Sequence, residues 1–292
     1  MTLNKKILAA VDLNEDTGRI LAYALWLAET VDAGSSEIDM LHVMDYALTP
    51  PAYVVPYIEK EKVESEKALE EWKRRLAGFG ARVEFRIAVG RLIETFNKAI
   101  RETDAGTMVL GHKSHMLRAS SSERLMRSAD VNLLVVRGRK AEGAVPGSVE
   151  IKRIVCAVDF SENSRRAVDF ARALAAASSS DLVIANIVSK LKLEESFKRF
   201  RDMSEAEREG YREHAIRQAE EDICSVLQVC GGAQSIVKIG DPYSAINEVA
   251  AETDAGLIVM GARGLSPVKG AMLGSIAESV VKASPCPVVI VR

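Results

Sequence analysis

The chain repeats itself once, with the same blocks of sequence in the same order in both halves. Asn4–Asp12 matches Ile151–Asp159 at an offset of 147 residues, and Glu102–Gly106 recurs unchanged as Glu252–Gly256. A repeat of about half the 292 residues is too long for one unit of a solenoid and has the size of an ordinary domain. The sequence therefore predicts two copies of one domain in tandem.

The repeat places the predicted domains at residues 1–137 and 151–292. Between them, Gly138–Glu150 is rich in Gly, Ala, Ser and charge and lacks apolar periodicity. That composition is typical of a connecting segment, so residues 138–150 are predicted to be a linker.

Bulk composition excludes several classes of function. Apolar residues make up 48% and charged residues 27%, as in soluble globular proteins, and the net charge of −2 gives no basic excess for nucleic acid. No apolar run approaches the roughly 20 residues that span a bilayer, and no signal peptide is visible. The four cysteines form no CxxC pair, which favours buried or incidental thiols. We expect a cytoplasmic protein without membrane or nucleic-acid partners.

Short apolar runs alternate with longer amphipathic stretches in each copy. The predicted strands are 7–11, 37–43, 82–89, 107–110 and 132–136, then 154–158, 182–188, 233–239, 257–260 and 288–291. The predicted helices are 16–30, 60–77, 92–103 and 120–128, then 162–177, 204–229, 243–253 and 275–283. The runs are β-branched and nearly continuous, as in parallel strands covered on both faces. We predict an α/β fold with two tandem, doubly wound, parallel five-stranded sheets.

Ligands of such sheets bind beyond the carboxyl ends of the strands, which makes the residues after each strand the candidate site. In the second copy Asp159 follows the first strand, and its carboxylate could accept hydrogen bonds from a ligand. Asp159 or Ser161 could instead cap the next helix, and on this segment alone capping is the favoured interpretation.

A glycine-rich loop follows the fourth strand of the second copy. Gly261 and Gly264 are three apart, and nine residues separate Gly264 from Gly274, which with Ser275 opens the last helix. Glycines let backbone N–H groups approach an anion, and a helix N-terminus adds unpaired N–H donors. The side chain of Arg263 can add charge. A flexible turn is the alternative, but the position between a parallel strand and a helix favours phosphate binding. No Walker-type GxxxxGK[ST] motif is present.

Both copies resemble the universal stress protein domain, and the resemblance covers almost the whole chain. Nucleotide-binding members of that family carry a G-x2-G-x9-G-(S/T) motif, which here reads Gly261, Gly264, Gly274 and Ser275. The strand-end Asp of the family matches Asp159. The resemblance implies the adenine nucleotide alpha hydrolase-like fold and one ATP, with or without Mg²⁺, in the C-terminal domain.

The resemblance also implies the residues of the ATP site. Adenine or ribose would meet Ala157, Asp159 and Ile187, with the apolar Met260 placed before the first motif glycine. The phosphates would lie among Gly261, Arg263, Gly264, Gly274, Ser275 and Ile276. No catalytic residue and no metal ligand is predicted.

The first copy departs from the motif at the phosphate end. It keeps Asp12 and Gly111, but Ser114 and Ala119 stand in place of the second and third glycines. The loop runs 8 positions from Gly111 to Ala119, against 13 in the second copy. We predict weak or absent ATP binding there. A basic cluster in this loop could meet an anion, although a solvated loop is favoured; its members are His112, Lys113, His115 and Arg118. Two histidines without a third ligand predict no metal site.

Two further segments stand out. Leu48–Ile58 is rich in proline and apolar residues, and packing over its own domain is favoured over an exposed partner or ligand contact. Lys190–Arg208 is charged and amphipathic, which is compatible with a mobile lid or an oligomer contact.

Three functions are compatible with these features. The favoured one is an ATP-binding, nucleotide-dependent sensor or regulator of the stress response. The second is a slow ATPase or autophosphorylating protein, slow because no general base or metal carboxylate stands out. The third is a scaffold or small-ligand binder without nucleotide. By the resemblance, the last strands of the two copies would pair as a pseudo-dimer, and a further homodimer is also compatible.

Overall fold

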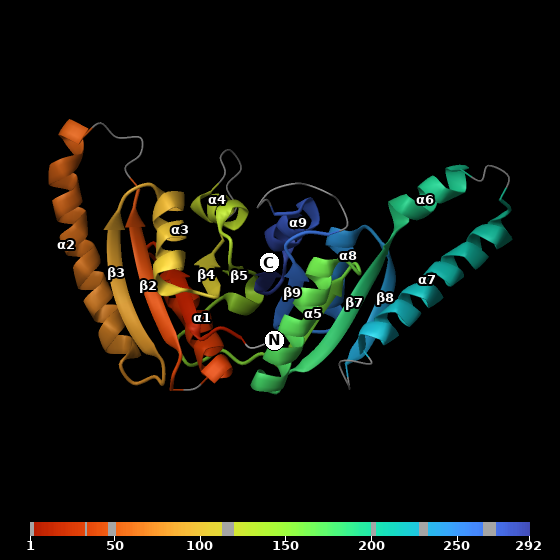
Figure 1. The fold of residues 1–292 in the computed structure, drawn as a ribbon, viewed down its shortest axis with the longest axis horizontal. Coiled ribbons are helices and arrows are strands. Elements are labelled where there is room, and N and C mark those ends of the chain that lie inside the picture. The colour runs from red at the N-terminus through yellow and green to blue at the C-terminus, as the bar shows by residue number, and fades with distance from the viewer. Residues whose placement is uncertain are drawn as a thin grey trace. The chain divides into compact units, whose positions relative to one another are not determined.

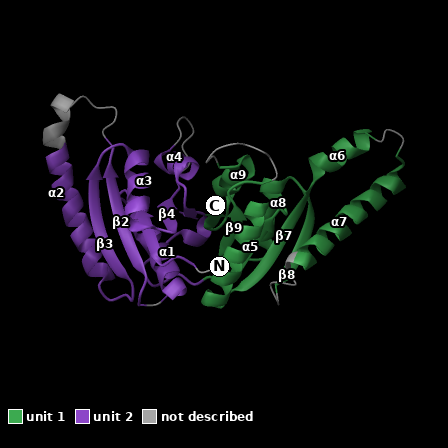
Figure 2. Cartoon of the chain, in the orientation of Figure 1, with its two compact units in different colours: residues 1, 151–268, 273–292 green, residues 2–150, 269–272 purple. Residues whose placement is uncertain are grey.

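The computed structural model describes residues 3–32, 34–45, 51–112, 120–199, 203–227, 233–264 and 273–292, with residues 51–57 and 226–227 described by their backbone alone. The described residues form two compact units, one ending at Glu150 and the other beginning at Ile151 (Figure 2). Each unit is built on a five-stranded parallel sheet with helices between the strands (Figure 1).

The sheet of the N-terminal unit has the strand order β3-β2-β1-β4-β5, and its paired strands are parallel. Its strands are β1 (Lys6–Ala10), β2 (Glu37–Met44), β3 (Arg82–Val89), β4 (Thr107–Gly111) and β5 (Asn132–Val136). Its helices are α1 (Thr17–Asp32), α2 (Pro51–Leu76), α3 (Leu92–Thr103) and α4 (Ser121–Ser128).

The C-terminal unit repeats this arrangement as β10-β9-β6-β7-β8. Its strands are β6 (Arg153–Val158), β7 (Asp181–Ser189), β8 (Gln234–Gly240), β9 (Leu257–Gly261) and β10 (Val288–Val291). Its helices are α5 (Glu162–Ser178), α6 (Lys190–Arg199), α7 (Glu205–Leu227), α8 (Pro242–Glu252) and α9 (Ser275–Ala283). The predicted α/β fold with two parallel five-stranded sheets is confirmed.

Burial explains why the strands could be found in the sequence. Successive side chains of a strand point to opposite faces, and in β2 every residue from Ile38 to Met44 is buried. All five residues of β9 are buried in the same way. The chain reverses its winding direction at β1 and at β6, since their neighbours are β2 with β4 and β7 with β9. Such a switch point opens a crevice at the carboxyl ends of the central strands, where Asp12 and Asp159 follow.

Two segments differ from the sequence-based expectation. The helix predicted at 60–77 begins earlier, because the described part of the proline-rich segment is helical from Pro51 onward as the start of α2. Proline is well tolerated at the first position of a helix, because the N–H that it lacks has no partner there. The predicted linker contains a short 3₁₀ helix, Arg139–Ala141, and the Lys140 carbonyl accepts a hydrogen bond from the Tyr23 hydroxyl at 3.3 Å.

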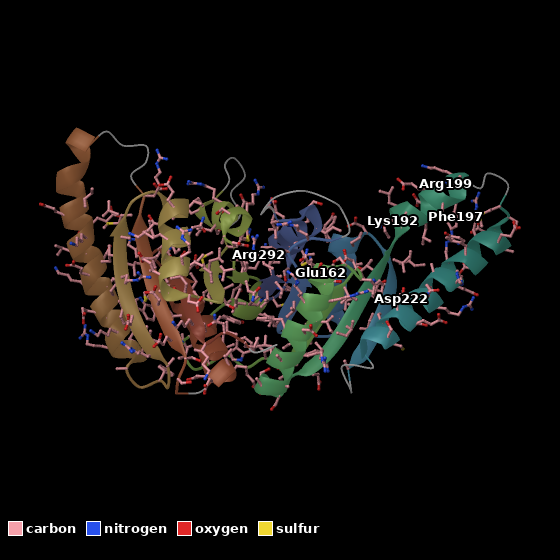
Figure 3. All side chains as sticks on the ribbon, viewed as in Figure 1. Glu162, Lys192, Phe197, Arg199, Asp222 and Arg292 are labelled. Atoms are coloured by element: carbon pink, nitrogen blue, oxygen red, sulfur yellow. The ribbon has the colours of Figure 1, made fainter. Side chains whose placement is uncertain are left out.

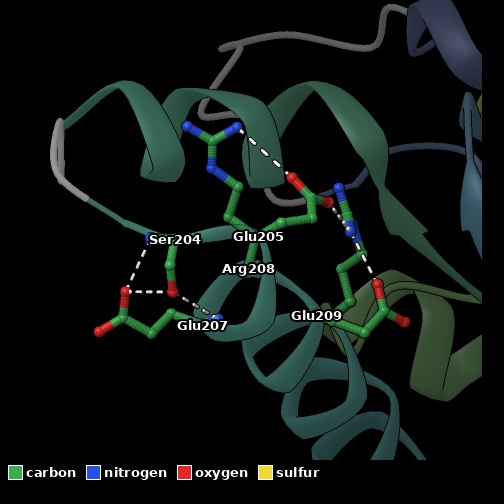
Figure 4. A network of polar contacts seen from close by, with 6 residues as sticks. Ser204, Glu205, Glu207, Arg208 and Glu209 are labelled. Atoms are coloured by element: carbon green, nitrogen blue, oxygen red, sulfur yellow. Dashed lines mark hydrogen bonds and ion pairs between the residues drawn. The ribbon is translucent and has the colours of Figure 1, made fainter.

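Helices α6 and α7 form an arm beyond β7 and β8 (Figure 3). The rings of Phe197 and Tyr211 pack edge to face, with their centres 5.8 Å apart. The guanidinium groups of Arg208 and Arg212 lie 5.8 and 5.4 Å from the centre of the Phe197 ring. The carboxylate of Glu205 on α7 pairs with both arginines, at 3.8 Å from Arg208 and 3.1 Å from Arg212 (Figure 4). These contacts join α6 to the first turns of α7. No helix among the described residues is long and apolar enough to cross a membrane.

Candidate functional site

Asp159 follows β6 on a tight turn. Phe160 adopts a left-handed conformation with φ +63°, and Asp159 Oδ1 accepts a hydrogen bond from the Ser161 N–H at 3.1 Å. The Ser161 hydroxyl in turn caps α5 by accepting from the Ser164 N–H at 3.2 Å. Capping of α5 therefore falls to Ser161, while Asp159 holds the turn that leads into the cap.

The neighbouring strand fixes the end of β6. The buried Asn186 amide on β7 donates from Nδ2 to the Val158 carbonyl at 2.8 Å. The next residue, Ile187, is half-buried at the carboxyl end of β7. On the other side of β6, Ala157 stands opposite Met260 of β9, and both are buried. Ala157, Ile187 and Met260, the three apolar residues predicted for the site on these strands, thus come from three adjacent strands of one sheet edge.

The glycine-rich loop is held at both of its ends. The Ala262 N–H donates to the Val291 carbonyl at 2.8 Å, and the Gly274 N–H donates to the Ala262 carbonyl at 2.8 Å. Residues 265–272 of the loop lie outside the described residues. These two bonds bring the third motif glycine, Gly274, next to Ala262, which directly follows the first motif glycine.

Packing explains why glycine stands at positions 261 and 264. A Cβ on Gly261 would lie 2.9 Å from the carbonyl carbon and the Cβ of Asn163 in the first turn of α5. A Cβ on Gly264 would overlap Asp159 Oδ2. At Gly274 the added atom would lie 3.2 Å from the Ala262 carbonyl oxygen, which is tight but not prohibitive. The structure therefore brings Asp159 and the glycine loop together, although they are far apart in the sequence.

The N-terminus of α9 carries no side-chain cap. Gly274 is the residue before the helix and has no side chain to bond the first N–H groups. Ser275 and Ile276 are exposed, and Arg263 is half-buried at the start of the loop. A helix end of this kind presents unpaired N–H donors and the positive end of the helix dipole, which is the arrangement that binds phosphate groups.

The equivalent helix end of the N-terminal unit is closed by the protein itself. Ser120 and Glu123 form a capping box on α4: the Ser120 hydroxyl accepts from the Glu123 N–H at 3.2 Å, and Glu123 Oε2 accepts from the Ser120 N–H at 3.1 Å. Glu123 is buried, so a carboxylate of the chain already occupies this end of the helix. The sequence signature of this cap is Ser-x-x-Glu before an amphipathic helix, and Ser120 and Glu123 carry it.

Of the basic cluster predicted in the first copy, only His112 falls in the described part of the chain; Lys113, His115 and Arg118 lie outside it. His112 is buried, and its Nδ1 lies 3.3 Å from the Ser122 hydroxyl. Its backbone N–H donates to the Val136 carbonyl at 3.3 Å, as Ala262 does in the other unit. His112 thus packs against α4 and is not part of an exposed basic surface.

The N-terminal unit also has a cleft that the sequence did not reveal. It has a volume of about 410 Å³ and lies at the carboxyl ends of β1, β2 and β4. Asp12, Gly111 and the serines 120–122 line it together with apolar side chains. Its place in the sheet is the one that Asp159 and the glycine loop hold in the other unit. Among the described residues, no group of three or more His, Cys, Asp or Glu side chains could hold a metal ion.

Comparison with known proteins shows the family of the chain and similar folds. The Universal stress protein family matches residues 3–137 and again 150–292. A universal stress protein of Thermus aquaticus is 32% identical over 148 residues, which are 48% of this chain and 98% of that protein. A universal stress protein of Archaeoglobus fulgidus superposes with a TM-score of 0.69 at 24% identity, over 98% of this chain and 96% of that one. A putative universal stress protein of Pseudomonas aeruginosa superposes with a TM-score of 0.65 at 17% identity, over 98% and 92%.

Proposed function

Because this chain belongs to the universal stress protein family, with two tandem domains of that family, we propose that it is a nucleotide-dependent regulator that holds one ATP in its C-terminal unit. The observation that carries the proposal is the open N-terminus of α9. Gly274 gives the first N–H groups of that helix no side-chain cap, while the corresponding helix of the N-terminal unit is closed by the capping box of Ser120 and Glu123. One unit can therefore receive a phosphate chain at this position, and the other already holds a carboxylate there.

The proposed contacts follow from the placement of each group. The N–H groups at the start of α9, the Ser275 hydroxyl and the Arg263 guanidinium would hold the phosphates. Ala157, Ile187 and Met260 would give the base an apolar surface along the sheet edge. Mg²⁺ bound with ATP would take its ligands chiefly from the phosphate oxygens, since it keeps few protein ligands in such sites.

Asp159 makes the site selective for a nucleotide over free phosphate. Its carboxylate stands against Gly264, within the loop that would hold the phosphates. A negative charge in this place opposes a bare anion, but it accepts hydrogen bonds from a ligand that carries hydroxyl or amino groups next to its phosphates. A ribose or an adenine meets that requirement, and inorganic phosphate does not.

Calorimetry of the full chain with ATP, and with inorganic phosphate in a parallel titration, tests the proposal. In Gly274→Asp the new carboxylate would cap α9 from the position at which Ser120 caps α4, and it would place a negative charge there, so ATP binding should fall by at least about 100-fold. Gly274→Ala adds the same Cβ without the charge, and we expect its ATP affinity to stay within about threefold of the parent. ATP binding that survives in Gly274→Asp, or inorganic phosphate that binds as tightly as ATP, would contradict the proposal.

A further inference from the structure

The cleft of the N-terminal unit has an apolar wall. Six of its lining side chains come from two strands and three helices, and all six are buried: Ile20, Val43, Leu92, Phe96, Leu110 and Leu125. A volume of about 410 Å³ falls in the range of pockets that enclose small organic molecules. The wall therefore suits a ligand with an apolar body.

A carboxylate without a partner stands at the same cleft. Asp12 is exposed and lines the cleft, and no hydrogen bond or ion pair joins its side chain to another described residue. In the C-terminal unit the matching Asp159 accepts from the Ser161 N–H. In the N-terminal unit no described N–H donates to the Asp12 carboxylate, and Asn14, which matches Ser161, uses its own Oδ1 to accept from the Asp16 N–H at 2.9 Å. Among the described residues, the Asp12 carboxylate is therefore open to a ligand.

The other charged side chains of the described residues that line the cleft disfavour an anionic ligand. Asp16 also lines the cleft, and its carboxylate is paired with Arg19 at 2.8 Å. Ser120, at the end of α4, is already bonded to Glu123. A phosphate chain would thus meet two aspartates and a helix end that holds a carboxylate. A positively charged group would meet Asp12 with nothing to displace.

From these three observations we propose that the N-terminal cleft binds a small amphipathic amine, with its ammonium group on Asp12 and its apolar body on the wall formed around Phe96 and Leu110. A charge-assisted hydrogen bond at the cleft mouth gives the ligand its orientation, and burial of the apolar body gives it affinity. The site is separate from the proposed ATP site and does not depend on it.

Three probes with one ring system and different charges test the proposal: tryptamine, indole-3-ethanol and indole-3-acetate, each titrated into the full chain by calorimetry. Tryptamine should bind with one site per chain and about tenfold tighter than the neutral alcohol, and the acid should not bind. Asp12→Asn should weaken tryptamine about tenfold and leave the alcohol unchanged. Asp130→Asn is the matched control, because Asp130 is an exposed carboxylate that precedes β5 and is remote from the strand ends that form the cleft.

Several results would overturn the proposal. One is that tryptamine does not bind saturably up to about 10 mM. Another is that indole-3-acetate binds as tightly as tryptamine. A third is that Asp12→Asn leaves the tryptamine affinity unchanged. Displacement of tryptamine by ATP would make the cleft a nucleotide site and would equally reject it. The Gly274→Asp protein separates the two proposals, because it should lose ATP and still bind tryptamine.

Discussion

Asp159 and Gly264 occupy touching positions: a Cβ at position 264 would overlap the Oδ2 atom of Asp159. The strand-end aspartate and the second motif glycine are therefore not independent features of the site. The glycine leaves the space in which the carboxylate stands. The first and third motif glycines have other neighbours, Asn163 and the Ala262 carbonyl, and each position consequently tolerates substitution differently.

Gly264→Ala should weaken ATP binding while leaving the fold intact. The carboxylate is the end of a side chain and can rotate away from the new methyl group, so the free energy of unfolding should change by less than about 1 kcal/mol. The displaced carboxylate no longer meets the ligand, and ATP affinity should fall about tenfold by calorimetry. Gly210→Ala is the control, because a Cβ there has no neighbour within 4 Å. Equal ATP affinities in the two variants would show that the contact with Asp159 is irrelevant to binding.

Gly261→Ala should act on stability instead. The new Cβ would lie 2.9 Å from backbone and Cβ atoms of Asn163, which cannot rotate away. Overpacking of this kind costs about 2 kcal/mol, to be measured as a lower urea midpoint at an unchanged slope. A free energy of unfolding equal to that of Gly264→Ala would mean that α5 shifts to make room.

Ser120→Ala should destabilise the N-terminal unit by about 1 kcal/mol, because it removes the hydroxyl that accepts from the Glu123 N–H and caps α4, and leaves only the bond from the backbone N–H of residue 120 to Glu123. Ser121→Ala, one residue further on at an exposed position, is the matched control and should leave stability within about 0.5 kcal/mol. Chemical unfolding measures both. The prediction fails where the two alanine variants unfold at the same denaturant concentration.

Asp39→Asn should be the more damaging of two changes around Arg86. Arg86 bonds both oxygens of the buried Asp39, one of them from Nε at 2.9 Å, and these hydrogen bonds raise the pKa of the Arg86 guanidinium above its usual range. Loss of the charge should cost about 2 kcal/mol in urea unfolding. Glu102 lies 3.3 Å from the same guanidinium but is half exposed, and Glu102→Gln should cost about 0.5 kcal/mol or less. A larger loss of stability in Glu102→Gln than in Asp39→Asn would contradict the view that Asp39 is the main partner of Arg86.

The start of α7 should loosen in acid. Glu207 accepts hydrogen bonds from the Ser204 hydroxyl at 2.8 Å and from the Ser204 N–H at 2.7 Å, and these bonds lower its pKa (Figure 4). A carboxyl whose pKa is lowered by folding stabilises the fold above its unfolded pKa, and this contribution is lost as the pH falls through the folded value. The first turn of α7 should therefore fray below about pH 4.

NMR titration of the Glu207 carboxyl measures this effect directly. In Ser204→Ala the hydroxyl donor is gone, and the carboxyl should titrate at a higher pH than in the parent chain. Identical titration curves in the two proteins would show that the hydroxyl does not hold the carboxylate in solution.

Much of the fold could be predicted because burial on both faces leaves a continuous apolar run in the sequence. β3, β5 and β10 begin and end at the predicted residues. The start of α2 was not predicted, because the proline residues of segment 48–58 suit a loop as well as the first position of a helix. The cleft beside Asp12 could not be predicted, since it depends on how side chains from three helices fill space between them. The capping box of α4 could be predicted from Ser120 and Glu123. The difference between the two units became evident only from comparison with α9, which Gly274 does not cap.

The capping box of α4 also makes the difference between the two units hard to reverse. Under the proposed function, a longer loop and restored glycines would not give the N-terminal unit a phosphate site while Glu123 still fills the helix end. Replacement of Glu123 alone would lower stability without adding a ligand site. Under that proposal, a change toward a phosphate site in the N-terminal unit begins with a loss of stability, and the capping box of Ser120 and Glu123 keeps the two units on different ligands.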